Sequence, residues 1–98
     1  MGPAEDAITL GSHVRIREDV VFRELQGEMV LLNLKTGVYF GLDPVGTRIW
    51  HLMQEPRSLQ EILDALVGEY EVARARCQAD LLTFVTRLRE KELIEVSR

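Results

Sequence analysis

Three side chains in this chain are of the types that most often perform chemistry, namely His13, His51 and Cys77. The two histidines lie far apart in the sequence, and neither has a second His or Cys at the spacing of a zinc site. Cys77 falls on the apolar stripe of a predicted helix, where a thiol packs as a small hydrophobic group, and no general base accompanies it. The sequence therefore predicts no catalytic residue, no metal site and no bound cofactor.

Composition restricts the class of protein further. The chain has 98 residues, of which 46% are hydrophobic and 29% charged, as in one globular domain. A net charge of −4 disfavours non-specific binding to nucleic acid. The longest uninterrupted apolar run, residues 29–32, is far too short to cross a membrane. With a single cysteine and no recognisable signal sequence, we expect a cytoplasmic protein without disulfide bonds or a membrane partner.

Hydrophobic patterns in the first half of the chain predict strands. Residues 1–12 carry little periodicity, so we expect a flexible N-terminal arm followed by a single domain over residues 13–98. Gly27 and Gly37 each stand in a polar stretch that predicts a tight turn. The strands are expected at residues 14–17, 20–25, 29–34 and 38–42. Three or four of them should form an antiparallel meander with the last strand at an edge.

The second half of the chain changes to the 3.6-residue period of helices. The Asp-Pro pair at residues 43–44 is suited to open a first helix. Ser58 and Glu61 have the spacing of a capping box ahead of a second helix. A third helix is expected over about residues 72–91, and a short strand or tail over residues 93–96. The predicted fold is α+β, a three- to four-stranded antiparallel meander followed by a three-helix, winged-helix-like bundle that covers its apolar face.

A winged-helix-like bundle also suggests DNA binding, but the charges argue against it. Cations on or beside the third helix alternate with acidic residues: Arg74, Arg76, Arg87, Arg89 and Lys91 against Glu69, Glu71, Asp80, Glu90 and Glu92. No basic face results, so DNA binding is the less favoured alternative and no nucleic-acid partner is predicted.

The strongest functional signal is the strand over residues 38–42. Charged residues and proline usually protect an exposed sheet edge from pairing with other chains, and this strand contains neither. Such an edge is either covered within the chain, with residues 93–96 as the candidate, or offered to a partner. The second interpretation is β-augmentation, in which an extended peptide adds one strand and places alternate side chains in a neighbouring groove. The pattern alone leaves both interpretations open.

The residues around this strand resemble the signature of the PqqD family. The matching segments are VLLNLKTGVYFGLD at residues 30–43 and GTRIW at residues 46–50. They correspond to a strand, a glycine turn, an aromatic strand that ends in Leu-Asp, and a helix with a Gly and an Ile-Trp pair. The leucine-rich second helix and the late Leu-Ile pair continue the match, so the resemblance spans about residues 14–96.

The resemblance implies a non-catalytic recognition element that binds the leader segment of a ribosomally made precursor peptide. Members of the family place the leader as an added strand against the third strand of the meander, in a cleft shared with the last helix. Carried over by position, the peptide-binding residues are Val38, Tyr39, Phe40, Gly41, Leu42, Asp80, Leu81, Phe84 and Arg87. The two apolar residues of the helix should line a pocket, with its two charged residues at the rim.

The aromatic pair Tyr39 and Phe40 and the helix over residues 47–50 look most like the stand-alone leader-binding proteins of lasso-peptide clusters. This closer resemblance implies a leader peptidase and an ATP-dependent macrolactam synthetase as partners. The alternative is a chaperone that delivers its peptide to a radical-SAM enzyme, as the pyrroloquinoline-quinone member of the family does.

Overall fold

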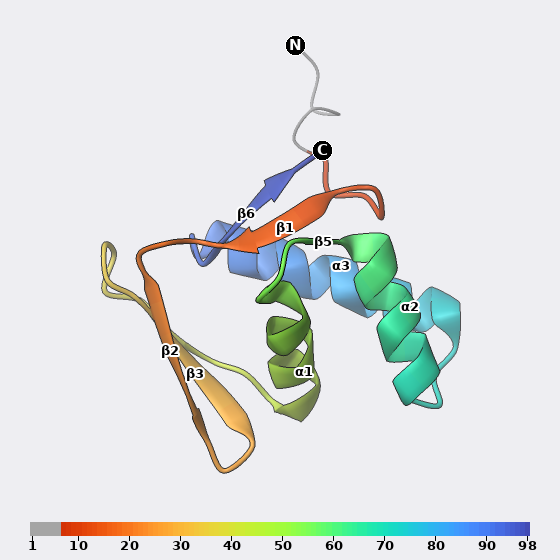
Figure 1. The fold of residues 1–98 in the computed structure, drawn as a ribbon, viewed down its shortest axis with the longest axis horizontal. Coiled ribbons are helices and arrows are strands. Elements are labelled where there is room, and N and C mark those ends of the chain that lie inside the picture. Colours follow the sequence, from red (N-terminus) through yellow and green to blue (C-terminus); the bar gives the residue numbers. More distant parts are fainter. Residues whose placement is uncertain (1–6) are drawn as a thin grey trace.

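The structure is a computed structural model that describes residues 7–98. This part of the chain forms two small antiparallel sheets and three helices (Figure 1). In chain order the elements are β1 (His13–Ile16), β2 (Val20–Leu25), β3 (Glu28–Asn33), β4 (Tyr39–Gly41), α1 (Pro44–Met53), β5 (Arg57–Ser58), α2 (Leu59–Glu69), α3 (Arg74–Glu90) and β6 (Ile94–Ser97).

The strands β2, β3 and β4 form an antiparallel meander in that order. Gly27 and Gly37 have φ angles of 83° and 76° in its two turns, a region that residues with a side chain rarely adopt. Leu31 in the middle of β3 is fully buried, and its cross-strand partner is Phe40. The α+β class, the three-stranded meander and its turns are confirmed, although β4 is shorter than the expected residues 38–42.

β1 lies outside the meander, which therefore has three strands, within the expected range of three to four. β1 is the central strand of a second sheet with the order β5-β1-β6. The two-residue strand β5 has no periodicity of its own, and the sequence did not indicate it. Both partners of β1 come from segments more than forty positions further along the chain. Local periodicity shows that a strand is half-buried, but it does not show which distant strand pairs with it.

The expected N-terminal arm lies partly outside the described residues, which begin at residue 7. In the described part of the arm, Ile8 and Leu10 pack against the core and Ser12 is buried. The carbonyls of Leu10 and Ser12 each accept a hydrogen bond of 2.9 Å from the backbone at the start of α2. The packed domain therefore extends to the N-terminal side of His13.

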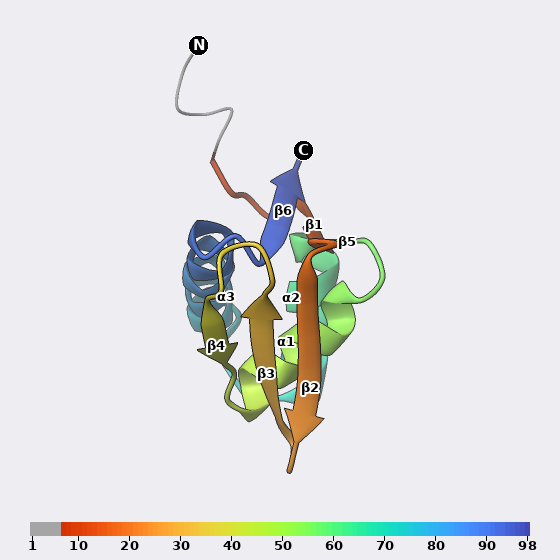
Figure 2. The same cartoon turned by 90° about the vertical axis from the view of Figure 1, so that its left-hand side faces the viewer.

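The helices lie behind the β2-β3-β4 meander when its open face is turned to the viewer (Figure 2). α1 packs directly on β3, and the backbone N–H of Met29 donates a hydrogen bond of 2.9 Å to the Thr47 hydroxyl. Trp50 is fully buried, and the Phe22 ring meets it edge to face with ring centroids 5.5 Å apart. The core thus lies between the meander and the helices, as the pattern of apolar residues predicts.

The helix starts follow the caps that the sequence indicates. The Asp43 carboxylate accepts a hydrogen bond of 2.7 Å from Gly46 N at the start of α1. Ser58 and Glu61 make both hydrogen bonds of a capping box at the start of α2. α3 is slightly shorter than the expected residues 72–91, and Ala73 at its N-cap offers no side-chain acceptor. None of these helices is both long and apolar enough to cross a membrane, among the residues that the structure describes.

Candidate functional site

The outer edge of β4 presents the backbone groups of two residues. The N–H of Leu42 donates to the carbonyl of Met29 at 2.8 Å, and in an antiparallel ladder every second residue is hydrogen-bonded in this way. Phe40 also directs its N–H and C=O toward β3. Tyr39 and Gly41 direct theirs away from β3. We name the outward N–H and C=O groups of Tyr39 and Gly41 the open edge.

Within residues 7–98, no strand pairs with the open edge. β6, which the sequence offered as its cover, pairs with β1, so the expectation that residues 93–96 cover this edge is wrong. The opposite edge of the meander differs in chemistry, because β2 carries Arg23 and Glu24, charges of the kind that discourage pairing. The uncharged edge of the meander is therefore the one suited to receive an added strand.

α3 lies behind the meander on the side of β4, where Figure 2 shows the helix nearly end-on. The Cζ atom of Arg87 stands 5.4 Å from the centroid of the Phe40 ring, within the range of a cation–π contact. Phe40 is the cross-strand partner of buried Leu31, so its side chain lies on the helix-facing side of β4. A strand added at the open edge would therefore have α3 on its helix-facing side, with Arg87 close to the middle of β4.

A pocket of about 640 Å³ lies among the three helices, close to the point where β4 leads into α1. We name it the helical pocket. Apolar side chains dominate its wall, and three of them are well exposed to solvent: Val45, Tyr70 and Val72. The complete lining is Asp43, Val45, Gly46, Ile49, Leu66, Tyr70, Val72, Ala73, Arg76, Cys77, Asp80, Leu81 and Phe84. An open pocket of this composition is suited to an apolar side chain of a ligand.

Phe84 both lines the helical pocket and packs α3 onto α1. A Cβ atom added to Gly46 would lie 3.3 Å from Phe84 Cζ and 3.2 Å from a carboxylate oxygen of Asp43. The absence of a side chain at Gly46 therefore allows the Phe84 ring to approach the first turn of α1. The ring remains half-buried, so part of it faces the pocket.

The structure brings together most of the predicted binding residues, in two groups. Residues 38–42 supply β4 and its flanks, and three of the four predicted α3 residues line the helical pocket. Arg87 does not line the pocket and lies over Phe40 instead. Leu42 is a core residue with 4% exposure, and its N–H is bonded to β3, so it is not available to an added strand.

The three groups that the sequence analysis considered for chemistry, Cys77, His51 and His13, lie on three different elements, α3, α1 and β1. Burial raises the pKa of the Cys77 thiol, and the nearby Asp80 charge raises it further, which keeps the thiol protonated. The Nε2 atom of His51 is 2.9 Å from a carboxylate oxygen of Glu24 and joins α1 to β2. His13 is exposed on β1. No three metal-ligating side chains converge within the described residues.

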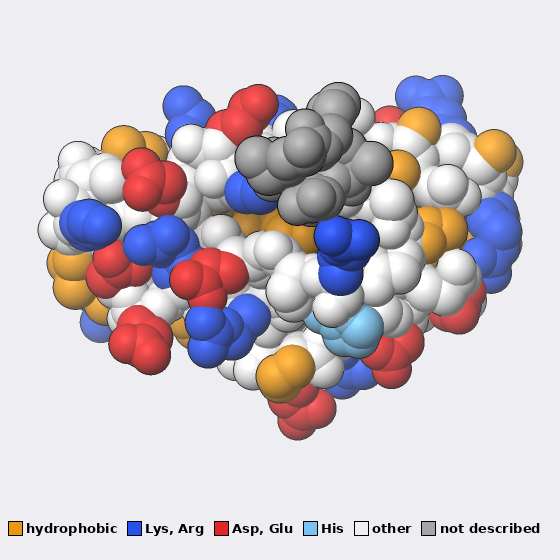
Figure 3. Space-filling view, turned by 90° about the horizontal axis from the view of Figure 1, so that it is seen from above, with side chains coloured by type: hydrophobic (Ala, Val, Ile, Leu, Met, Phe, Trp, Pro, Cys, Tyr) orange, Lys and Arg blue, Asp and Glu red, His pale blue; other side chains and the backbone are white. Residues whose placement is uncertain are grey.

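The surface charges are of mixed sign. On the face seen from above in Figure 3, Lys and Arg side chains stand next to Asp and Glu side chains. Two cations of α3 are paired in the same way, Arg74 with Asp64 at 3.0 Å and Arg76 with Asp80 at 3.9 Å. Pairing of this kind reduces the positive potential that a nucleic-acid interface needs.

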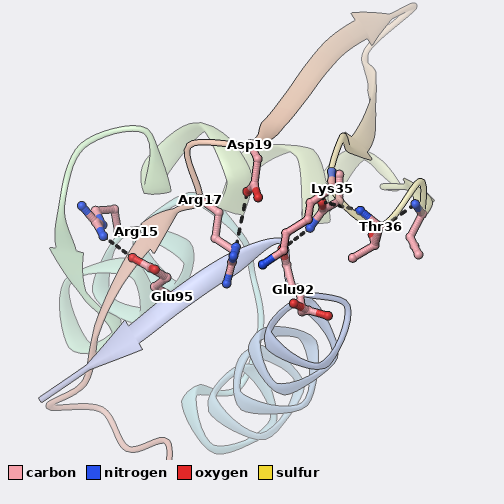
Figure 4. A network of polar contacts seen from close by, with 9 residues as sticks. Arg15, Arg17, Asp19, Lys35, Thr36, Glu92 and Glu95 are labelled. Carbon is pink, nitrogen blue, oxygen red and sulfur yellow. Dashed lines mark hydrogen bonds and ion pairs between the residues drawn. The ribbon is translucent and has the colours of Figure 1, made fainter.

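Asn33 positions β4 relative to α3, a role that was not predicted from the sequence. Its side-chain oxygen accepts hydrogen bonds from the N–H groups of Lys35 and Thr36, at 2.8 and 3.1 Å. Its Nδ2 group donates to the carbonyl of Glu92 at 2.6 Å, which ties the β3–β4 turn to the segment after α3 (Figure 4). An Asn before Lys-Thr-Gly is typical of a turn that it caps itself, but the bond to Glu92 has no signal in the sequence.

Comparison with known proteins gives one family and two similar structures. The sequence matches the family described as coenzyme PQQ synthesis protein D (PqqD) over residues 28–94. The structure described as TbiB1 in complex with the TbiA(beta) leader peptide is 47% identical, with a TM-score of 0.79 over 83% of this chain and 94% of that chain. A lasso peptide synthetase B1 complexed with the leader peptide is 27% identical, with a TM-score of 0.76 over 84% and 96%. No curated protein matches the sequence.

The matched region contains both parts of the site. Residues 28–94 include β3, β4, all three helices of the described part and the first residue of β6, and therefore the open edge and the helical pocket. The 47% identity with a solved structure extends over most of both chains. The match over more than half of the sequence, together with this shared fold, shows that the chain belongs to the PqqD family.

Proposed function

We propose that this chain is a non-catalytic recognition element that binds the leader segment of a ribosomally synthesised precursor peptide. The leader adds to the open edge as an antiparallel strand beside β4, with alternate side chains directed toward α3. The observation that carries the proposal is the open edge itself, an uncharged edge with outward backbone groups at Tyr39 and Gly41, close to which Arg87 of α3 contacts Phe40.

In the same site, the helical pocket would receive an apolar side chain of the leader that anchors it. β4 leads through Leu42 into Asp43, which lines the pocket, so a peptide that continues past the end of β4 reaches the pocket directly. Apolar side chains that fill such a pocket usually carry most of the binding free energy. Phe84 and Leu81 form its floor in this proposal, and Asp80 stands near its rim, where it is exposed.

The two similar structures support a lasso-peptide pathway in particular. Both are described as complexes with a leader peptide, and one of those proteins is called a lasso peptide synthetase B1. This favours a lasso-peptide role over delivery to a radical-SAM enzyme. In the proposal the chain acts in the cytoplasm and presents the leader to a leader peptidase and a macrolactam synthetase, which perform the chemistry.

A pair of substitutions at Gly41 tests the added strand. Gly41→Pro removes an outward N–H and fixes φ, whereas Gly41→Ala keeps the N–H and places a Cβ that meets nothing within 4 Å. The probe is a fluorescein-labelled TbiA(beta) leader peptide, and binding is followed by fluorescence anisotropy. We expect Gly41→Pro to weaken binding about tenfold or more and Gly41→Ala to change it by less than about twofold.

Circular dichroism and thermal melts establish that each variant is folded before its affinity is compared. Tyr39→Pro removes the other outward N–H and serves as a second variant if Gly41→Pro does not fold. A folded proline variant with wild-type affinity would contradict strand addition at this edge. Failure of the wild-type chain to bind the probe would contradict leader binding as proposed.

A further inference from the structure

Arg87 is the cation of the site that has no acidic partner among residues 7–98. On the same helix, Arg74 and Arg76 are each paired with an aspartate. Within residues 7–98 no ion pair involves Arg87, whose guanidinium lies over the Phe40 ring. A cation–π contact engages the charge of the guanidinium and does not pair its N–H donors with an acceptor oxygen. Arg87 is exposed, so these donors can reach a ligand.

The register of the meander shows which residue of an added strand would meet these donors. In an antiparallel strand bound to Tyr39 and Gly41, the residue opposite Phe40 forms a non-hydrogen-bonded pair. Such pairs have the shorter Cα separation, about 4.5 Å, and their side chains point to the same face. That face is the helix-facing side, where Phe40 contacts Arg87. One side chain of the leader is therefore directed at Arg87.

We propose that Arg87 makes the chain selective for a leader with an acidic side chain, Asp or Glu, at the position opposite Phe40. This inference rests on the proposed function. A carboxylate is the group that matches the planar fork of a guanidinium, because it accepts two parallel hydrogen bonds. The Phe40 ring holds the guanidinium in place before the leader binds, which lowers the entropy cost of that contact.

The other end of the site has the opposite charge preference. Asp43 and Asp80 both line the helical pocket, and within residues 7–98 an ion pair is formed by Asp80, with Arg76 at 3.9 Å, but not by Asp43. An acidic leader residue near that pocket would face these carboxylates. The site thus distinguishes positions along the leader: an acidic side chain is favoured opposite Phe40 and disfavoured at the pocket.

A charge scan of the probe tests this selectivity. Each position of the fluorescein-labelled TbiA(beta) leader peptide is replaced in turn by Glu and by Gln, which have the same shape and differ in charge. Each pair is titrated against the wild type, Arg87→Gln, and Arg23→Gln as a matched control, since Arg23 is an exposed arginine on the far strand of the meander. We expect one helix-facing position at which Glu binds about fivefold tighter than Gln to the wild type and to Arg23→Gln, but not to Arg87→Gln.

Two further readouts distinguish a charge contact from a merely structural role of Arg87. The preference for Glu should disappear at about 1 M salt, where the Debye length falls to about 3 Å. Arg87→Glu should prefer a Lys-substituted probe at the same position. A Glu/Gln ratio below about twofold at every position, or a preference that persists in Arg87→Gln, overturns the inference while leader binding stands. Absence of any binding by the wild type overturns both.

Discussion

The side-chain amide of Asn33 donates a hydrogen bond to the main-chain carbonyl of Glu92, 2.6 Å away and 59 residues further along the chain. Asn33 belongs to β3 and is fully buried, and Glu92 follows α3 with a positive φ of 58°. The bond therefore joins β3, which pairs with β4, to the segment that follows the end of α3. We expect this bond to hold the open edge and Arg87 in one arrangement before a peptide binds.

Replacement of Asn33 by Ala should lower both stability and affinity for the leader probe. The change leaves the N–H groups of Lys35 and Thr36 and the carbonyl of Glu92 without their partner, which costs about 2 kcal/mol in the free energy of unfolding. Val14→Ala is the matched control, because it removes buried contacts of similar worth from the β5-β1-β6 sheet. Urea unfolding and anisotropy titrations compare the two. If Asn33→Ala and Val14→Ala have equal stability and bind the leader probe with equal affinity, Asn33 does not position the site.

Replacement of Phe84 by Ala should weaken binding of the leader probe by about 2 kcal/mol, because the apolar leader side chain in the helical pocket loses its contact with the Phe84 ring. The control is Phe22→Ala, which removes an equal side chain that packs on Trp50 from β2, away from the open edge. Both variants should melt at lower temperature, but only the first should lose affinity. The pocket assignment fails if Phe84→Ala is folded and binds like the wild type, or if both variants lose affinity equally.

The capping box of α2 should make stability depend on pH on the acid side. Hydrogen bonds from the backbone and then the side chain of Ser58 hold the pKa of Glu61 below its ordinary value of 4.5. Because the pKa is lowered in the folded state, ionised Glu61 contributes stability above the unfolded value near 4.5. That contribution is lost as the pH falls through the lower, folded pKa. Glu61→Gln should therefore be less stable than the wild type near neutral pH and approach it in acid.

Urea unfolding midpoints measured from neutral pH to below 4.5 check this dependence. Glu28→Gln, an exposed Glu in the meander, serves as the control for removal of one negative charge. The capping interpretation is wrong if the two variants lose the same stability, or if the difference between Glu61→Gln and the wild type stays constant over the acid range.

The sequence by itself determined those features that depend on neighbouring residues. Turns at Gly27 and Gly37 need a positive φ, the capping box at Ser58 and Glu61 spans three positions, and amphipathic helices repeat every 3.6 residues. Each of these can be recognised within a short window, and each is present in the structure. The uncharged strand around Tyr39 was recognisable for the same reason, because its lack of charge and proline is a local property.

The tertiary structure alone decided which segments meet. Pairing of β1 with β6 depends on registers between residues about eighty positions apart, and this pairing is what leaves the edge of β4 uncovered. The bond from Asn33 to Glu92 and the approach of Arg87 to Phe40 likewise join segments that no local pattern connects. Periodicity specifies which face of an element is buried, whereas packing of the whole chain specifies its partner. For this reason the sequence identified the strand of the site and the helix beside it, whereas only the fold placed Arg87 over Phe40 and not at the rim of the pocket.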